Sequence, residues 1–137
     1  MVSKIDILEP YYKSEIKVMK QSNPQIKEIY NTTAENFDFK KKYNVIFGSW
    51  LFGNLTDKNA VKFLIKCKAN LEANGVFIIK ENIESETMQS KSKLKQRIRT
   101  LKSYEILFNL ARFKIIYSED TKDWPEECFN LKVFVLN

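Results

Sequence analysis

Two short, almost continuously apolar runs do most to limit what this 137-residue chain can fold into. They are Tyr43–Trp50 ("YNVIFGSW") and Val76–Asn82 ("VFIIKEN"), and a segment with helical spacing separates them. Runs of this kind are typical of strands that helices cover on both faces of a sheet. Thr56 or Asp57 can cap the intervening helix, and the "NG" at 74–75 can end it. The sequence therefore predicts two buried strands joined by a helix.

The rest of the chain continues this alternation of strands and helices. The other predicted elements are a strand over Lys4–Glu9, a helix over Tyr11–Ser22, a short strand and then a loop over Ile26–Phe37, a long helix over roughly Lys91–Arg112, and a terminal strand pair over Lys114–Asp120 and Leu131–Leu136. This order predicts an α/β sandwich with a mostly parallel sheet and an antiparallel C-terminal strand pair. With only three glycines and three prolines, the chain shows no linker, so we expect a single domain over 1–137.

Composition narrows the chemistry. The chain has no histidine, which nearly excludes zinc sites and histidine-based acid–base catalysis. Cys67 and Cys128 are far apart, and we interpret them as reduced thiols of an intracellular protein rather than as a disulfide. No apolar run approaches the length of a membrane span, so we expect no membrane partner.

The net charge of +6 is unevenly distributed, because six basic residues and no acidic ones lie between positions 91 and 102. They are Lys91, Lys93, Lys95, Arg97, Arg99 and Lys102. On the predicted long helix, several of these follow one another at helical spacing. Such a cluster is often only a solvated helix face, but it also suits the phosphate backbone of a nucleic acid. Both interpretations remain open at this point.

Several motifs resemble those of the protein α-N-terminal (Xaa-Pro-Lys) methyltransferases, which use S-adenosylmethionine (SAM) to methylate N-terminal amines. "YNVIFGSWLFGNLTDKN" is similar to the family's Tyr-Asp-Val-Ile, Gln-Trp and Gly-His-Leu-Thr-Asp pattern. "FLIKCK", "IIKEN" and the closing "WPEECFNLKVFVL" match further family segments, so that the resemblance runs from Ile5 to Leu136. It implies a truncated class I methyltransferase fold, which is Rossmann-like.

The resemblance also implies which residues stand at the cofactor site. Glu9 is at the position of an acidic residue that binds the ribose, and Ala34 and Glu35 are where residues flank the adenine. Ser49 replaces a glutamine on the cofactor side. For Glu9, we favour the simpler interpretation of a strand-end carboxylate before Pro10.

At the substrate site, Trp50 matches a substrate-stacking tryptophan and Asn82 matches a substrate-contacting asparagine. Asn54 replaces the family's catalytic histidine, and the family's two carboxylates fall on Lys91 and Leu94. We favour Trp50 as an apolar plug in the core or at an interface, and Asn82 as a residue that satisfies backbone groups.

By the same resemblance, the chain begins at the family's second strand and lacks the first strand with its glycine-rich turn. That strand is central in the family's sheet, so its loss exposes two strand edges. The two edges can pair directly, a partner chain can fill the gap, or the sequence is a fragment. Met1 favours a true start.

These departures lead us to expect a non-catalytic accessory subunit without a cofactor. It would be a nuclear scaffold within a methyltransferase complex, with protein subunits and DNA as partners. Size and composition are also similar to an accessory subunit of the ciliate DNA N6-adenine methyltransferase complex. The alternative is a SAM-dependent N-terminal amine methyltransferase, present as a fragment or completed by a partner.

Overall fold

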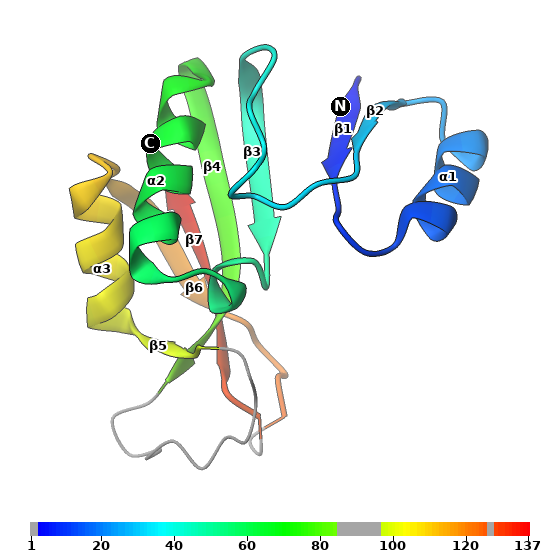
Figure 1. Cartoon of the computed structure of the whole chain (residues 1–137). Coiled ribbons are helices and arrows are strands. Elements are labelled where there is room, and N and C mark those ends of the chain that lie inside the picture. Colours follow the sequence, from blue (N-terminus) through cyan, green and yellow to red (C-terminus); the bar gives the residue numbers. More distant parts are fainter. Residues whose placement is uncertain (1–2, 85–96, 126–127) are drawn as a thin grey trace. The chain divides into compact units, whose positions relative to one another are not determined.

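The computed structural model describes residues 3–84, 97–125 and 128–137 (Figure 1). Its contacts divide the chain into two compact units, Met1–Asp38 and Phe39–Asn137. The expectation of a single domain over 1–137 stays a prediction. None of the helices in the described ranges is long and apolar enough to cross a membrane.

The first unit is a small βαβ arrangement. Its elements are β1 (Ile5–Leu8), α1 (Lys13–Ser22) and β2 (Ile26–Tyr30), and β1 pairs with β2 in parallel. The helix ends before Asn23-Pro24 because the residue preceding a proline disfavours helical backbone. Ile16 and Phe37 are buried, and the ring of Phe37 lies 4.9 Å from that of Tyr30. The predicted strand, helix and second strand are therefore confirmed.

The second unit is a five-stranded sheet with two helices. Its elements are β3 (Tyr43–Ser49), the 3₁₀ turn η1 (Phe52–Asn54), α2 (Asp57–Ala69), β4 (Leu71–Glu84), β5 (Arg99–Thr100), α3 (Leu101–Leu110), β6 (Ile115–Asp120) and β7 (Asn130–Leu136). The strand order is β3-β4-β7-β6, and β5 also pairs with β4. β3 and β5 are parallel to β4, whereas β7 is antiparallel to both β4 and β6. The predicted α/β fold and antiparallel C-terminal pair are confirmed.

The core of the second unit lies between the sheet and its two helices, which cover the same face of the sheet (Figure 1). Phe77 of β4 and Phe134 of β7 are fully buried on this face. The ring of Phe77 lies 6.2 Å from that of Phe52, which in turn packs against Phe63 of α2. The ring of Phe134 lies 5.8 Å from that of Tyr104 on α3. Burying each such ring stabilises the fold by roughly 1.5–3 kcal/mol.

The prediction that β3 is buried on both faces is wrong. Val45 is 49% exposed and Phe47 is 62% exposed. The physical reason is that β3 is an edge strand of the second unit's sheet, and that α2 and α3 cover only the sheet face opposite to Val45 and Phe47. Direct pairing of the two edges is likewise not observed among the described strands, because β1 pairs with β2 and β3 pairs with β4.

Two predicted helix boundaries also differ. α2 ends at Ala69 and β4 already begins at Leu71, so that the "NG" at 74–75 lies within the strand. The predicted long helix begins only at Leu101, because Thr100 caps it by accepting a hydrogen bond from the N–H of Ser103 at 3.2 Å. The part of that prediction over 91–96 lies outside the described residues.

Candidate functional site

Trp50 lies directly after β3 and is the centre of a polar cluster. Its backbone φ is 48°, an uncommon left-handed conformation for a residue with a side chain. Its N–H donates to the carbonyl of Lys80 at 3.0 Å, which fixes the turn to β4. Trp50 is 47% exposed, so a plug in the core is not observed, while the alternative of a plug at an interface stays a prediction. The ring is instead presented to the surface.

The structure brings the three predicted substrate-site residues together. The indole Nε1 of Trp50 donates to Oδ1 of Asn82 at 3.4 Å, and Nδ2 of Asn54 donates to the carbonyl of Trp50 at 3.1 Å. Asn82 belongs to β4, so the cluster lies at the carboxyl ends of two parallel strands, where open α/β sheets bind ligands. The Nζ of Lys80 lies 5.9 Å from the centre of the Trp50 ring, a cation–π distance. The cluster thus offers an aromatic face that attracts cations and side-chain amides that form hydrogen bonds.

Glu81 was not predicted, and it binds the backbone that directly follows Trp50. Its Oε1 accepts hydrogen bonds from the N–H of Leu51 at 2.6 Å and of Phe52 at 2.8 Å. The side chain is buried, and this burial raises the pKa of Glu81 to about 7, although the two backbone hydrogen bonds oppose the rise. Strand alternation could have identified it, because residues 77, 79, 81 and 83 share the buried face.

Arg99 holds the other side of the same loop. It is only 6% exposed, and it donates from Nη2 to the carbonyl of Leu55 at 2.7 Å and to Oδ1 of Asp57 at 2.8 Å. Its Nη1 also donates to the carbonyl of Phe52 at 2.5 Å. The prediction that Arg99 belongs to an exposed basic face is therefore wrong. Its guanidinium satisfies carbonyl groups that would otherwise be buried without a donor.

The two other described basic positions, Arg97 and Lys102, do not continue a helix face with Arg99. Arg97 precedes β5 outside any helix, is exposed, and its backbone N–H donates to the carbonyl of Gly53 at 2.9 Å. Lys102 is exposed in the first turn of α3. Lys91, Lys93 and Lys95 lie outside the described residues, as does Leu94.

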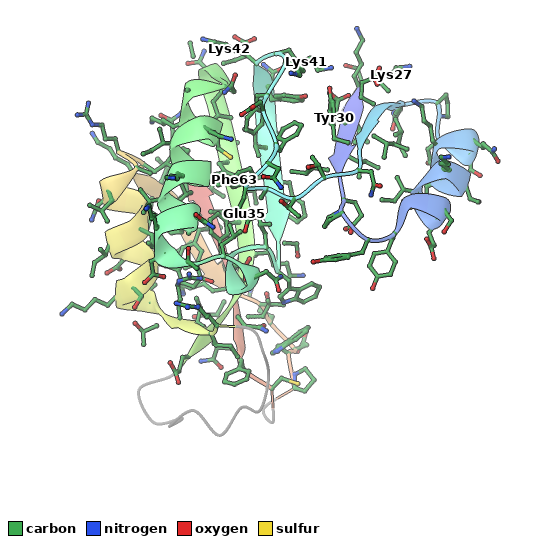
Figure 2. All side chains as sticks on the ribbon, viewed as in Figure 1. Lys27, Tyr30, Glu35, Lys41, Lys42 and Phe63 are labelled. Atoms are coloured by element: carbon green, nitrogen blue, oxygen red, sulfur yellow. The ribbon has the colours of Figure 1, made fainter. Side chains whose placement is uncertain are left out.

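The three predicted cofactor-site residues also follow or end strands. Glu9 comes after β1, donates its N–H to the carbonyl of Tyr30 at 3.0 Å, and accepts at Oε1 from the N–H of Tyr11 at 2.8 Å. Glu35 is exposed in the loop after β2 (Figure 2). Ser49 is the half-buried last residue of β3. Glu9 and Glu35 belong to the first unit and Ser49 to the second. Among the described residues, no cluster of acidic residues or cysteines could hold a metal ion.

Two curated relatives cover most of the chain. The chain is 30% identical over 112 residues to the alpha N-terminal protein methyltransferase 1 of Dictyostelium discoideum, which is 82% of this chain and 42% of the relative. It is 24% identical over 136 residues to the N-terminal Xaa-Pro-Lys N-methyltransferase 1 of Danio rerio, which is 98% of this chain and 61% of the relative. The chain therefore spans about half the length of these curated relatives.

Solved structures agree with the fold. A SAM-dependent methyltransferase from Leishmania major superimposes with a TM-score of 0.85 at 25% identity, over 98% of this chain and 55% of that one. A SAM-dependent methyltransferase from Clostridium acetobutylicum gives a TM-score of 0.77 at 10% identity, over 98% of this chain and 74% of that one. The predicted class I methyltransferase fold is confirmed.

These relatives correct the expected function. The prediction of a non-catalytic, cofactor-free accessory subunit is wrong, because proteins similar along most of the chain are named as methyltransferases and the Leishmania protein is SAM-dependent. A role in DNA methylation, and with it DNA binding, is not supported either, because the curated relatives are named for protein N-termini. The likeness to the ciliate accessory subunit is not confirmed.

The family model agrees over the full length. The model described as AdoMet-dependent proline dimethyltransferase matches residues 1–137. It is consistent with the cluster of Trp50, Asn54 and Asn82 at the positions that resemble the family's substrate site. The chain belongs to the AdoMet-dependent proline dimethyltransferase family.

Proposed function

We propose that this chain forms the substrate-binding part of a SAM-dependent methyltransferase that acts on protein N-terminal amines. The observation that carries the proposal is the hydrogen-bonded cluster of Trp50, Asn54 and Asn82. Family membership over 1–137 and the names of the curated relatives support it. Partner subunits and a nuclear location stay predictions.

The cluster suits an N-terminal peptide as substrate. The exposed face of Trp50 can stack on the first residues of a peptide. The side-chain amides of Asn54 and Asn82 can orient backbone groups of the peptide through hydrogen bonds. None of these three side chains titrates near neutral pH. Their part is therefore to bind and orient the amine, and its proton must leave to another group.

The chemistry of the cofactor-side residues fits SAM. Glu9 offers a carboxylate at the end of a parallel strand, where ribose hydroxyls are commonly bound, and Glu35 adds a carboxylate after β2 in the same unit. When bound, SAM supplies an electrophilic methyl group. A glycine-rich turn, which lets backbone approach such a cofactor closely, is not present among the chain's three glycines, 48, 53 and 75. Function therefore requires a segment that contributes this turn.

The test is methyl transfer from radiolabelled SAM to a peptide that begins with Xaa-Pro-Lys. The chain should be assayed alone and together with the part of the Dictyostelium relative that lies outside its match to this chain. Transfer is expected only with that part, and Trp50→Ala should reduce it at least about tenfold because stacking on an aromatic is lost. Trp124→Phe is the matched control, because Trp124 lies in the loop between β6 and β7. An assembly that binds SAM and the peptide without transferring the methyl group would contradict the proposal.

A further inference from the structure

Trp50 combines a half-exposed ring with a strained backbone. Its φ of 48° lies in the left-handed region, where a bulky side chain is a genuine outlier and costs free energy. Such a conformation persists only where the surrounding structure holds it in place. The contacts around this residue therefore have to supply the restraint.

Two residues of β4 bind Trp50 directly. The carbonyl of Lys80 accepts from the backbone N–H of Trp50 at 3.0 Å. Oδ1 of Asn82 accepts from the indole Nε1 at 3.4 Å. These contacts fix the residue at its own N–H and at its ring. They leave open what fixes the backbone that follows it, and the residue between the two on β4 is Glu81.

Glu81 binds the two amides that directly follow Trp50. Its Oε1 accepts from the N–H of Leu51 at 2.6 Å and from the N–H of Phe52 at 2.8 Å, and the residue is only 2% exposed. The carbonyl of Phe52 accepts from Nη1 of Arg99 at 2.5 Å. The ring of Phe52 is itself fully buried. The strained residue is therefore followed at once by a backbone that buried groups hold from both sides.

We propose that Glu81 is a positioning residue of the substrate site: by holding the amides of Leu51 and Phe52, it keeps Trp50 in the conformation that directs the indole at Asn82. The proposal rests on the proposed function, in which the ring stacks on the peptide. Without the acceptor, the two N–H groups would be buried and unsatisfied, so the loop would turn them toward water. Trp50 would then relax to a negative φ, and its ring would leave Asn82.

The loop needs an acceptor at this position rather than a charge. Glutamine keeps a carbonyl oxygen in the place of Oε1, whereas leucine has a similar size and no acceptor. Glu81→Gln and Glu81→Leu therefore separate hydrogen bonding from ionisation. Glu72→Leu is the matched control, because Glu72 is exposed near the opposite end of the same strand.

Tryptophan fluorescence reports the position of the ring in the chain alone. A Trp124→Phe background leaves Trp50 as the chain's one tryptophan. Quenching by acrylamide, which is uncharged, should rise about twofold in Glu81→Leu, because a ring that is 47% exposed becomes almost fully exposed. Glu81→Gln and Glu72→Leu should be quenched like the parent chain. Unchanged quenching in a folded Glu81→Leu variant, or an equal rise in Glu81→Gln, would overturn the proposal.

Hydrogen exchange tests the same contacts in the wild-type chain, so it decides the matter even where Glu81→Leu fails to fold. The amides of Leu51 and Phe52 should be protected to the same degree as the amide of Trp50, although Leu51 lies outside any strand or helix. Glu81→Gln should retain this protection. Fast exchange of both amides in the wild type would overturn the proposal.

Kinetics of the methyltransferase assembly connects this contact to function. Glu81→Leu should raise the KM for the Xaa-Pro-Lys peptide at least about tenfold and leave kcat nearly unchanged, because only the chains with a correctly placed Trp50 bind peptide. A loss of folded protein would instead lower kcat at constant KM, which would overturn the proposal. In a Trp50→Ala background, Glu81→Leu should not change KM further, because Glu81 acts through Trp50. A wild-type assembly without activity contradicts only the proposed function, since quenching and exchange still test the placement of the ring.

Discussion

Glu81→Gln isolates the energetic consequence of one buried carboxyl group. The variant keeps the shape of the side chain and a carbonyl oxygen that can accept from the N–H groups of Leu51 and Phe52. It removes only the ability to ionise. We therefore expect the variant to fold like the wild type and to differ from it in how its stability depends on pH.

The magnitude follows from the shift in the pKa of Glu81. Burial raises this pKa from its ordinary value of 4.5 to about 7. One pKa unit corresponds to about 1.4 kcal/mol, so that the full shift corresponds to about 3 kcal/mol of unfolding free energy. The folded chain binds the proton more tightly than the unfolded chain, so this contribution is complete below pH 4.5 and is lost as the pH rises through 7. Glu81→Gln should match the wild type near pH 5 and exceed its stability by up to about 3 kcal/mol at pH 8.

Urea unfolding followed by tryptophan fluorescence suits this measurement. The chain's two tryptophans, Trp50 and Trp124, both lie in the second unit, which also contains Glu81. Without histidine, few other groups titrate between pH 5 and 8. Glu72→Gln, at an exposed position of the same strand, is the matched control for the loss of a carboxyl group. Parallel pH profiles of Glu81→Gln and the wild type would refute the reasoning.

Three further outcomes are expected. Arg99→Lys should reduce the unfolding free energy by about 2–4 kcal/mol, because it leaves buried carbonyl groups without donors. Asp57→Asn should reduce it by less than about 1 kcal/mol, because the Asp57 side chain is 69% exposed. Equal losses for the two variants in urea unfolding would contradict this expectation. Thr56→Ala should cost about 1 kcal/mol, because Thr56 caps α2, and a loss restored by Thr56→Ser would confirm the cap. In thiol labelling under native conditions, the exposed Cys128 should react at least about tenfold faster than Cys67. Cys67 is fully buried, and this burial raises the pKa of its thiol. Similar rates for the two thiols would show that the core opens readily.

Local patterns in the sequence predict the elements of this fold well. The alternation at Ile5–Leu8 and the apolar run at Tyr43–Ser49 both correspond to strands. Such strands can be predicted because the burial of a strand requires a pattern of apolar residues along that strand itself. Exposure of Phe47 could not be predicted in this way. It depends on which elements cover the sheet, and this is a property of the whole assembly of layers.

The candidate site was predictable in part. Trp50, Asn54 and Asn82 stand in motifs that resemble a known family, and the structure brings them together. Arg99 looked like one more member of a basic cluster, because its burial depends on carbonyl groups up to 47 residues away in the sequence. Glu81 was missed for the same reason, since its partners precede it by 29 and 30 residues.

The position of β7 has a consequence for how the protein is made. The last described strand, β7 (Asn130–Leu136), lies between β4 and β6 in the sheet. Among the described strands, only β7 joins β6 to β4. During synthesis, β6 is therefore made before the strand that connects it to the sheet. The second unit must remain incomplete until its final residues leave the ribosome, with Phe77 and its neighbours lacking their cross-strand partners. Truncation before Asn130 would remove the centre of the second unit's sheet rather than its margin.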